Sequence, residues 1–595
     1  LNAAAEKSEE RGATADQDPS EDLKALAEAG IDMTDVTDTL LREGIEKFVE
    51  PFDELIRGVE SAREAAVTKR PATIASSIPD ELEPGIIEQV ERAQKERVVQ
   101  RIWRKDPTLW APEGTPEIAN RLGWLTVSDA MLDQADALEA FADECRADGL
   151  EYAVLLGMGG SSLGPEVIRR SFGDAGGMTL HVLDSTDPEA VLGTESAVDL
   201  DKTLFVVSSK SGGTVETLSH MRYFYERCGG DGSRFVAVTD PGSPLVEEAN
   251  HRGFRKVFEA DPNIGGRYSV LSHFGLVPAV LAGVNIRALL HGAQVAEQNC
   301  QSAHAVEANS GLWLGLAIGS LALQGHDKAT FVVSEPIHSF GLWVEQLVAE
   351  STGKQGRGIL PVADEPVGAP EDYGDDRVFV YLRNEEAPNE EHADKVEALS
   401  RAGHPTITLS AKGPEDLGRV FFVAEFAVAV AGWVLEINPF DQPNVQEAKD
   451  ATNRILARGL PELEPGDFRE VLDASPPQYV ALTGFMAPSE EIDAAVGELR
   501  SRIRGHTKSA TTFGYGPRYL HSTGQYHKGG PPNGVFVQFY HRAGEDVEIP
   551  EAGYGFEHLK LAQALGDAQT LREHGLTVVR VELQGDPAQA IERIL

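Results

Sequence analysis

Two turns rich in glycine and serine contain the residue types that bind small anions. The first, GMGGSSLG, covers residues 157–164, and the second, SSKSGGT, covers residues 208–214. Each turn follows an apolar, β-branched run and precedes a helical pattern, so it places hydroxyl groups and backbone amides at a helix N-terminus. Because both turns follow strands of a predicted parallel sheet, they lie at the same carboxyl edge. Together they predict a site for a small phosphorylated ligand, with the second turn at its phosphate.

The first turn also partly matches a dinucleotide-binding loop, which has three glycines and a downstream acidic residue. Gly157, Gly159 and Asp184 fit this pattern, but Ser162 occupies the third glycine position. An NAD-dependent oxidoreductase and a plain tight turn between strand and helix therefore remain alternatives. The hydroxyl-rich second turn favours a phosphate cradle, because a dinucleotide site does not need it.

The elements that position these turns alternate between short apolar runs and helical patterns. One block of strands lies in YAVLLGMGG, TLHVLDST, TLFVVSSKSGGT and RFVAVTDP, and a second lies in ATFVVSEP, RVFVYLRNE and PTITLSA. This alternation predicts an α/β protein with two tandem domains, each built on a doubly wound parallel sheet, over residues 111–296 and 297–470. The apolar segment 420–435 is interrupted by Glu425 and predicts a buried core helix rather than a membrane span.

The segments on either side are organised differently. Residues 68–110 begin with a Pro- and Ser-rich linker, up to residue 85, and continue as one charged helix that ends before Pro107. Residues 471–595 combine glycine-rich aromatic loops with a predicted helix at about 556–574 and a predicted strand, LTVVRVEL. We expect this last section to be a small α/β appendage packed on the two domains.

Composition excludes several classes of partner. The 595 residues carry a formal net charge of −42, which argues against binding to nucleic acid or to an anionic membrane. Lysine-poor, acidic chains of this kind suit a salt-rich cytoplasm, where ions screen the self-repulsion. Only three cysteines are present and no cluster of metal-ligand residues stands out, so we expect neither disulfides nor a metal. The expected location is the cytoplasm.

Five segments resemble phosphoglucose isomerases. Besides the two turns, they are NIGGRYSVLSHFGLVPAVLAG (263–283), FGLWVEQLVAESTGKQGRGILP (340–361) and INPFDQPNVQEAK (437–449). The resemblance implies tandem sugar isomerase (SIS) domains and a homodimer without cofactor. The implied activity is the interconversion of glucose 6-phosphate and fructose 6-phosphate, through ring opening and an enediolate, in glycolysis and gluconeogenesis. A non-catalytic sugar-phosphate-binding regulator built from the same domains is the alternative.

The resemblance also assigns roles to individual residues. Glu350 matches the base that moves a proton between adjacent carbons, Arg267 matches the fixed charge beside the enediolate, and Lys449 matches one of two ring-opening groups. These residue types suit the roles, because surroundings tune the pKa of a carboxylate and arginine keeps its charge. The residues expected to bind substrate are Gly159, Gly160, Ser161, Ser209, Lys210, Ser211, Thr214, Gln346 and Gln442.

The second ring-opening group of the family is a histidine between the glutamate and the lysine, and its motif is missing from that interval here. His404 lies there, but RAGHPTITL predicts a turn before a strand and a structural role. The C-terminal segment YGPRYLHSTGQYHKGGP contains His521 and His527. We expect the appendage to supply the histidine, with His521 preferred over His527.

The N-terminal residues 1–67 resemble the last portion of transaldolase, in which an amphipathic helix closes onto a barrel. An apolar stripe runs through this part at three- and four-residue steps from Leu41 to Leu55. The chain also begins at Leu1 without an initiator methionine. We therefore expect the C-terminal part of a bifunctional transaldolase/phosphoglucose isomerase, linked to the pentose phosphate pathway, with isomerase but no transaldolase activity in this chain.

Overall fold

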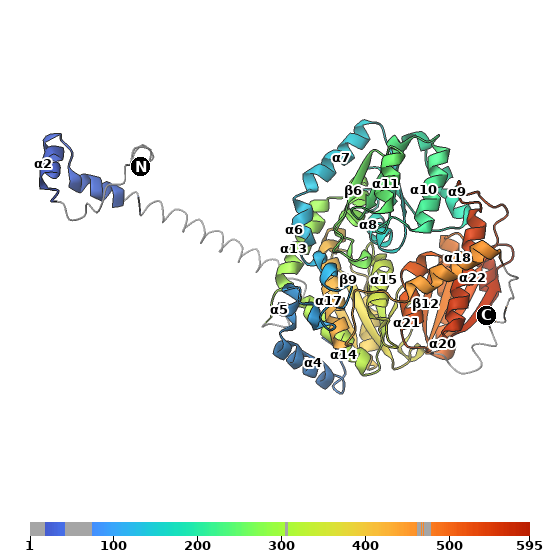
Figure 1. The fold of residues 1–595 in the computed structure, drawn as a ribbon. Helices are drawn as coiled ribbons and strands as arrows, with labels where there is room; N and C mark the ends of the chain where they lie inside the picture. The colour runs from blue at the N-terminus through green and yellow to red at the C-terminus, as the bar shows by residue number, and fades with distance from the viewer. Residues whose placement is uncertain are drawn as a thin grey trace. The chain divides into compact units, whose positions relative to one another are not determined.

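The computed structural model describes residues 18–41, 44, 74–303, 308–460, 466, 468 and 478–594, and it divides the chain into two compact units, Leu1–Arg70 and Pro71–Leu595. Helix α2 (Ser20–Glu28) belongs to the first unit, and residues 33–41 are also helical. The predicted apolar stripe lies outside the described residues beyond Leu41. All elements named below belong to the second unit (Figure 1).

The first sheet is entirely parallel and has the strand order β3-β2-β4-β5-β6. Its strands are β2 (Tyr152–Gly157), β3 (Thr179–Leu183), β4 (Thr203–Ser208), β5 (Phe235–Thr239) and β6 (Lys256–Glu259). The helices that follow these strands are α8 (Leu163–Phe172), α9 (Pro188–Ser196), α10 (Val215–Arg227), α11 (Pro244–His251) and α12 (His273–Leu281). Strands β2 and β4 are neighbours, with Gly157 paired to Ser208, so the two glycine-rich turns emerge side by side.

The second sheet has the order β1-β10-β9-β7-β8. Its parallel strands are β7 (Lys328–Val333), β8 (Leu360–Val362), β9 (Arg377–Asn384) and β10 (Thr406–Ala411). Strand β1 (Ala75–Ser77) pairs antiparallel with β10, so part of the predicted linker is an edge strand instead. The single helix predicted after the linker is also wrong. It is divided into α4 (Glu83–Glu96) and α5 (Val98–Trp103), because Arg97 adopts a left-handed conformation with φ of 56°.

Long helices join the first two sheets into one continuous hydrophobic core. They are α13 (Ile286–Cys300), α14 (Ser310–Leu323), α15 (Phe340–Thr352) and α17 (Leu417–Val434), and shorter helices such as α6 (Val127–Leu132), α7 (Ala135–Ala147) and α16 (Glu390–Arg401) cover the outside. Helix α17 contains the segment predicted as a core helix. It is long and apolar enough to cross a membrane by length and composition, but every residue of it is buried inside the protein. The prediction of a core helix is confirmed.

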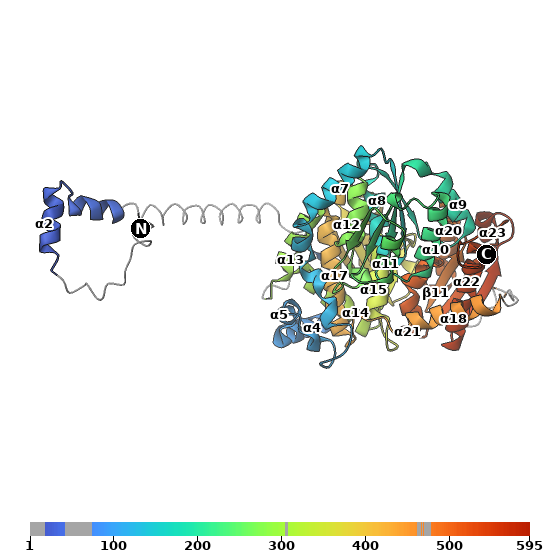
Figure 2. The same ribbon diagram turned by 45° about the horizontal axis from the view of Figure 1, so that its top comes forward.

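The C-terminal section is larger in structure than the small appendage expected. It forms a third parallel sheet, β12-β11-β13-β14, from β11 (Tyr479–Phe485), β12 (Ala510–Tyr515), β13 (Gly534–Tyr540) and β14 (Thr577–Glu582). Its helices are α20 (Glu490–Thr507), α21 (Gly524–Gly529), α22 (Phe556–Glu573) and α23 (Pro587–Glu592), and α18 (Val445–Arg458) packs on α22. A view turned by 45° shows the same third layer beside the first two sheets (Figure 2). The predicted helix at 556–574 corresponds to α22 and the predicted strand LTVVRVEL to β14, whereas β11, β12 and β13 were not predicted.

Candidate functional site

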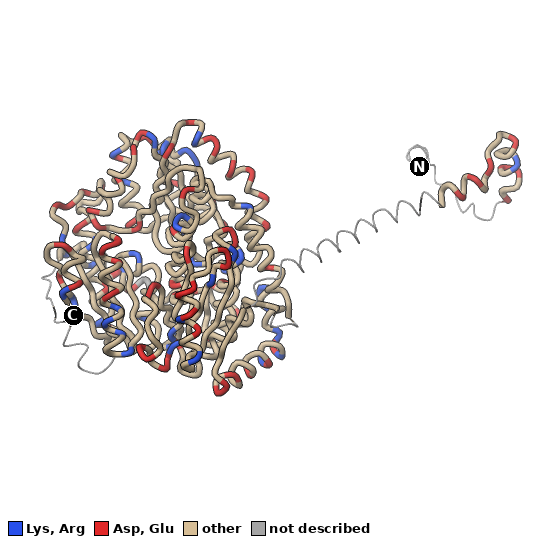
Figure 3. Tube along the Cα trace, turned by 180° about the vertical axis from the view of Figure 1, so that it is seen from behind, with Lys and Arg blue, Asp and Glu red and all other residues tan. Residues whose placement is uncertain are grey.

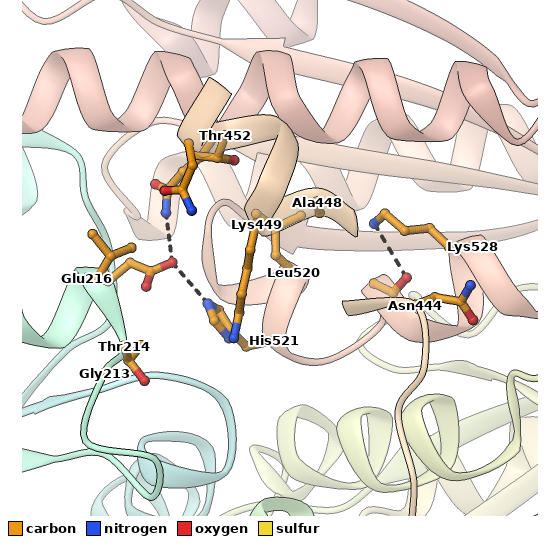
Figure 4. Close-up of a pocket in the computed structure, with 14 residues that line it drawn as sticks. Gly213, Thr214, Glu216, Asn444, Ala448, Lys449, Thr452, Leu520, His521 and Lys528 are labelled. Carbon is orange, nitrogen blue, oxygen red and sulfur yellow. Dashed lines mark hydrogen bonds and ion pairs between the residues drawn. The ribbon is translucent and has the colours of Figure 1, made fainter. Parts of the chain in front are cut away.

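A cavity of about 200 Å³ lies where the first sheet, helix α18 and the C-terminal section meet. The start of α10 contributes Thr214 and Glu216, and α18 contributes Lys449. The C-terminal section contributes His521 from the short 3-10 helix η11 (Arg518–His521) and Gln563 from α22. Figure 4 shows the Lys449 side chain extending from its helix towards His521. Segments separated by more than 300 residues therefore form one site.

Glu216 orients the histidine in this cavity. Its Oε1 atom lies 3.0 Å from His521 Nε2 and also accepts a hydrogen bond of 2.7 Å from Gln563 Nε2. Burial favours the neutral form of Glu216, but the charge and hydrogen bond of His521 outweigh it, so the pKa of the carboxyl is lowered. The sequence interpretation missed Glu216. The sequence shows only an acidic residue in the first turn of a helix, which is an ordinary position for a solvated glutamate.

The second glycine-rich turn presents an open helix N-terminus to the cavity. No side chain caps α10, and Gly213, Thr214 and Val215 line the cavity. The hydroxyls of Ser209 and Thr214 lie 2.9 Å apart. This arrangement leaves backbone amides and a hydroxyl for an anion.

The remaining predicted residues of this turn do not reach the cavity. Lys210 pairs with Asp240, at 2.6 Å between Nζ and Oδ2, and also lies 3.4 Å from the carbonyl of Pro262. Ser211 is exposed, and its hydroxyl accepts a hydrogen bond from the Gly213 amide at 3.4 Å.

The first turn is shaped by close packing rather than by a dinucleotide. A Cβ on Gly160 would lie 2.1 Å from the carbonyl oxygen of Gly266, and one on Gly159, which has φ of +55°, would lie 2.7 Å from that of His521. Ser161 is nearly buried beside them. The glycines therefore let this turn contact both the segment carrying Arg267 and the segment carrying His521.

Asp184, the acidic residue of the dinucleotide interpretation, already has protein partners. Its Oδ2 atom accepts a hydrogen bond from Ser162 at 3.2 Å and lies 3.2 Å from Arg518 Nε. Its side chain is 8% exposed, which leaves no room for a ribose. Among the residues that the structure describes, no group of three or more His, Cys, Asp or Glu side chains is arranged to hold a metal ion.

Glu350 and Arg267 form a buried pair next to this cavity, although neither lines it. Arg267 Nη1 lies 3.2 Å from Glu350 Oε2, and the two side chains are 3% and 6% exposed. Arg267 also donates to the Ser351 hydroxyl at 2.8 Å and to the backbone carbonyls of Pro439 and Asp441 at 2.8 and 3.0 Å. Burial raises the pKa of Glu350, and Arg267 opposes this rise. Helix α15 ends at Thr352, two residues after Glu350.

The two predicted glutamines occupy different environments. Gln346 lies one turn before Glu350 on α15, and its Nε2 donates to the carbonyl of His521 at 2.7 Å. Its Oε1 atom is buried without a hydrogen-bond partner in the described part of the chain. Gln442 is exposed and does not line the cavity. Gln346 thus connects the helix of the candidate base to the candidate histidine.

The other two candidate histidines lie elsewhere. His527 is buried against Tyr479, and burial lowers its pKa to about 3. His404 packs against the rings of Tyr373 and Phe379, and its Nε2 lies 3.3 Å from the carbonyl of Pro370. Of the three histidines considered, His521 alone lines the cavity.

Comparison with known proteins matches the chain to one enzyme family. A model described as phosphoglucose isomerase matches residues 129–359, a range that contains both turns, Arg267 and Glu350 but ends before Lys449 and His521. The glucose-6-phosphate isomerase of Rubrobacter xylanophilus is 31% identical over 375 residues, which are 53% of this chain and 85% of the relative. A probable glucose-6-phosphate isomerase of Haloarcula marismortui is 29% identical over 388 residues, covering 58% of this chain and 84% of the relative.

Solved structures share the fold. A hypothetical protein from Thermus thermophilus superposes with a TM-score of 0.54 and 27% identity, covering 64% of this chain and 100% of that chain. A glucose-6-phosphate isomerase from Chlamydia trachomatis gives a TM-score of 0.56 at 20% identity, covering 65% of this chain and 88% of its own. The predicted α/β architecture with parallel sheets is confirmed.

Proposed function

The chain belongs to the glucose-6-phosphate isomerase family, and we propose that it interconverts glucose 6-phosphate and fructose 6-phosphate. The observation that carries the proposal is the convergence of Lys449, His521 and the uncapped start of α10 on one cavity beside the buried pair of Glu350 and Arg267. A binding module needs the anion site alone. The added acid, base and fixed cation are what an isomerisation requires.

Substrate binding begins at the second turn in this proposal. The amides at the start of α10 and the Thr214 hydroxyl hold the phosphate, because the helix dipole favours an anion at this end. Lys449 and His521 then act as the acid and the base of ring opening. One donates a proton and the other accepts one, at the ring oxygen and the hydroxyl of the sugar ring. Glu216 keeps the imidazole oriented through its 3.0 Å contact.

Glu350 transfers the proton between carbons 1 and 2 of the substrate. Burial raises the pKa of Glu350, which makes it easier for the carboxyl to hold and return the proton that it takes from the substrate. Arg267 has a permanent positive charge and is held by three other oxygens, so it can stabilise the enediolate without moving. The substrate must displace part of the 3.2 Å contact between the two side chains to reach them.

The test is a coupled assay of fructose 6-phosphate conversion by the wild-type chain and by Glu350→Gln. We expect turnover to fall by roughly 10²- to 10⁴-fold, the usual contribution of a general base. Glu345→Gln is the matched control, because Glu345 is also a buried glutamate of α15 but lines a different cavity. Equal turnover of Glu350→Gln and wild type would remove this mechanism.

Several finer points belong to the same proposal. Residues 1–67 derive from the end of a transaldolase domain in a bifunctional parent, supported by the sequence resemblance and by the helical character of residues 20–28 and 33–41. The enzyme acts in the cytoplasm, and it forms a homodimer as the family resemblance implies. The proposal assigns no transaldolase activity to this chain, since that reaction needs a Schiff-base lysine on a barrel strand, and dihydroxyacetone transfer by the chain would contradict it. An NAD-dependent oxidoreductase is disfavoured by the partners of Asp184.

A further inference from the structure

A buried ion pair connects the segment that carries His521 to the first sheet. Arg518 and His521 are the first and last residues of the 3-10 helix η11. Arg518 Nε lies 3.2 Å from Asp184 Oδ2, and the two side chains are 14% and 8% exposed. Asp184 directly follows β3, and the same oxygen accepts the hydroxyl of Ser162 from the first glycine-rich turn. One carboxylate therefore links a turn of the first domain to the helical turn that carries the histidine.

The other contacts of η11 fix it to different parts of the molecule. Tyr519 donates to Asp567 Oδ2 on α22, which belongs to the same C-terminal section. The His521 carbonyl accepts from Gln346 on α15. Two side-chain contacts join η11 to the first domain: His521 Nε2 lies 3.0 Å from Glu216 Oε1 at the start of α10, and Arg518 Nε lies 3.2 Å from Asp184 Oδ2. Of these two residues of η11, His521 lines the substrate cavity and Arg518 does not.

A second cavity interrupts the packing on the side of η11 that Arg518 faces. It has a volume of about 320 Å³ and is lined by Arg518, Tyr519 and Ser522, and its other walls include the charged side chains of Arg170, Glu345 and Arg500. Apolar packing holds η11 elsewhere, because Tyr519 belongs to a buried cluster with Phe485. The buried ion pair of Arg518 is therefore one of several contacts that set the position of η11.

We infer that Asp184 and Arg518 are positioning residues that fix His521 relative to the phosphate turn. This inference rests on the proposed isomerase function. Neither residue lines the substrate cavity, so they act through the placement of the imidazole rather than on the substrate. A shift of about 1 Å in a catalytic group costs up to ~100-fold in rate. Loss of the pair should therefore slow ring opening and leave phosphate binding intact.

The variants are Arg518→Gln, Asp184→Asn, the double variant and the conservative Arg518→Lys. The double variant leaves no unpaired buried charge and so tests positioning where a single variant fails to fold. The matched control is Arg252→Gln. It removes the 3.1 Å contact between Arg252 and Glu551, which is another ion pair between the first domain and the C-terminal section. Arg252 lies far along the chain from His521. All proteins are compared by thermal melting and by kinetics with two substrates.

With glucose 6-phosphate we expect kcat to fall by roughly tenfold to a hundredfold in Arg518→Gln and in the double variant, with KM nearly unchanged. With erythrose 4-phosphate, whose chain is too short to form a sugar ring, turnover should stay within about twofold of wild type, because this substrate does not need His521. Arg518→Lys should recover part of the loss, and Arg252→Gln should match wild type with both substrates.

Two results would overturn the inference. One is an equal loss with both substrates, which indicates general damage to the site, and the other is an unchanged kcat for glucose 6-phosphate in the folded double variant. A wild-type chain that converts neither substrate would instead refute the proposed function itself, so the two failures are distinguishable.

Discussion

Replacement of Glu216 by glutamine isolates the electrostatic part of the contact with His521. The carboxylate is 5% exposed and accepts from both His521 Nε2 and Gln563 Nε2 on the same oxygen. A glutamine at this position has nearly the same shape, and its carbonyl oxygen can accept both hydrogen bonds. What it lacks is the negative charge that stabilises the imidazolium formed when His521 takes a proton.

The magnitude follows from the difference between the two kinds of hydrogen bond. A bond to a charged group contributes about 1.5–3 kcal/mol and a neutral one about 0.5–1.5 kcal/mol. The difference of about 1–1.5 kcal/mol corresponds to a ~5- to 12-fold slower ring-opening step, since each ~1.4 kcal/mol is tenfold in rate. Glu216→Ala, which removes the acceptor altogether, should cost up to ~150-fold by the same reasoning.

The assay couples fructose 6-phosphate formation from glucose 6-phosphate to a reporter enzyme and repeats the measurement with erythrose 4-phosphate. We expect the loss only with the substrate that must open a ring. Glu195→Gln is the control, because Glu195 binds Arg227 at the far end of α10, away from the cavity. The reasoning is refuted if Glu216→Gln and Glu216→Ala are equally active with glucose 6-phosphate, or if both substrates are slowed alike.

Three further predictions concern ring opening, the core and the surface. Lys449→Ala should lose roughly 10²-fold or more with glucose 6-phosphate but little with erythrose 4-phosphate, and equal losses in the two assays would contradict its role. Glu425 is fully buried in α17 with both carboxyl oxygens unpartnered in the described part of the chain, so Glu425→Met should stabilise the fold by about 1–3 kcal/mol in denaturant titrations. Burial raises the pKa of Glu425 well above 4.5, so wild-type stability falls as pH rises above ~4.5. The stability gained by Glu425→Met should therefore be larger at pH 8 than at pH 5. A gain that does not depend on pH would count against the buried carboxyl as its cause. Acidic positions are spread over the outer helices and loops (Figure 3), and the net charge is −42. This charge predicts a higher melting temperature in molar salt than in dilute buffer, because salt screens the repulsion between like charges. Identical melting temperatures would exclude self-repulsion as a destabilising force.

Local patterns were sufficient for most of the fold. Strands β2 to β5, β7, β9 and β10 and the buried helix α17 were predicted because apolar periodicity acts over a few neighbours. The short strands β6 and β8 were not predicted. The edge strand β1 was missed because its three residues are all exposed and only the pairing with β10 makes them a strand. The break at Arg97 was missed for a similar reason, since no glycine or proline marks it.

The candidate site shows the same difference between features with a local sequence pattern and features that depend on contacts between distant segments. Glu350 and Arg267 were named from segments that resemble the family, but their direct contact of 3.2 Å could not be read from positions 83 residues apart. Glu216 was not named at all, because a glutamate in the first turn of a helix is ordinarily a solvated residue that favours the helix dipole. Only the burial of Glu216 against His521, 305 residues away, distinguishes it.

By itself, the sequence determined the parallel α/β architecture, the two turns at one sheet edge and the enzyme family, since each depends on short segments whose residue types are diagnostic. Only the tertiary structure shows why the first turn needs glycines and which residue its Ser162 hydroxyl contacts. Gly159 and Gly160 allow other backbones to approach, and Ser162 binds Asp184, which in turn binds Arg518. Apart from the contact of Ser162 with Asp184, these contacts join residues more than a hundred positions apart, and no local pattern encodes which distant segment will pack against a given turn.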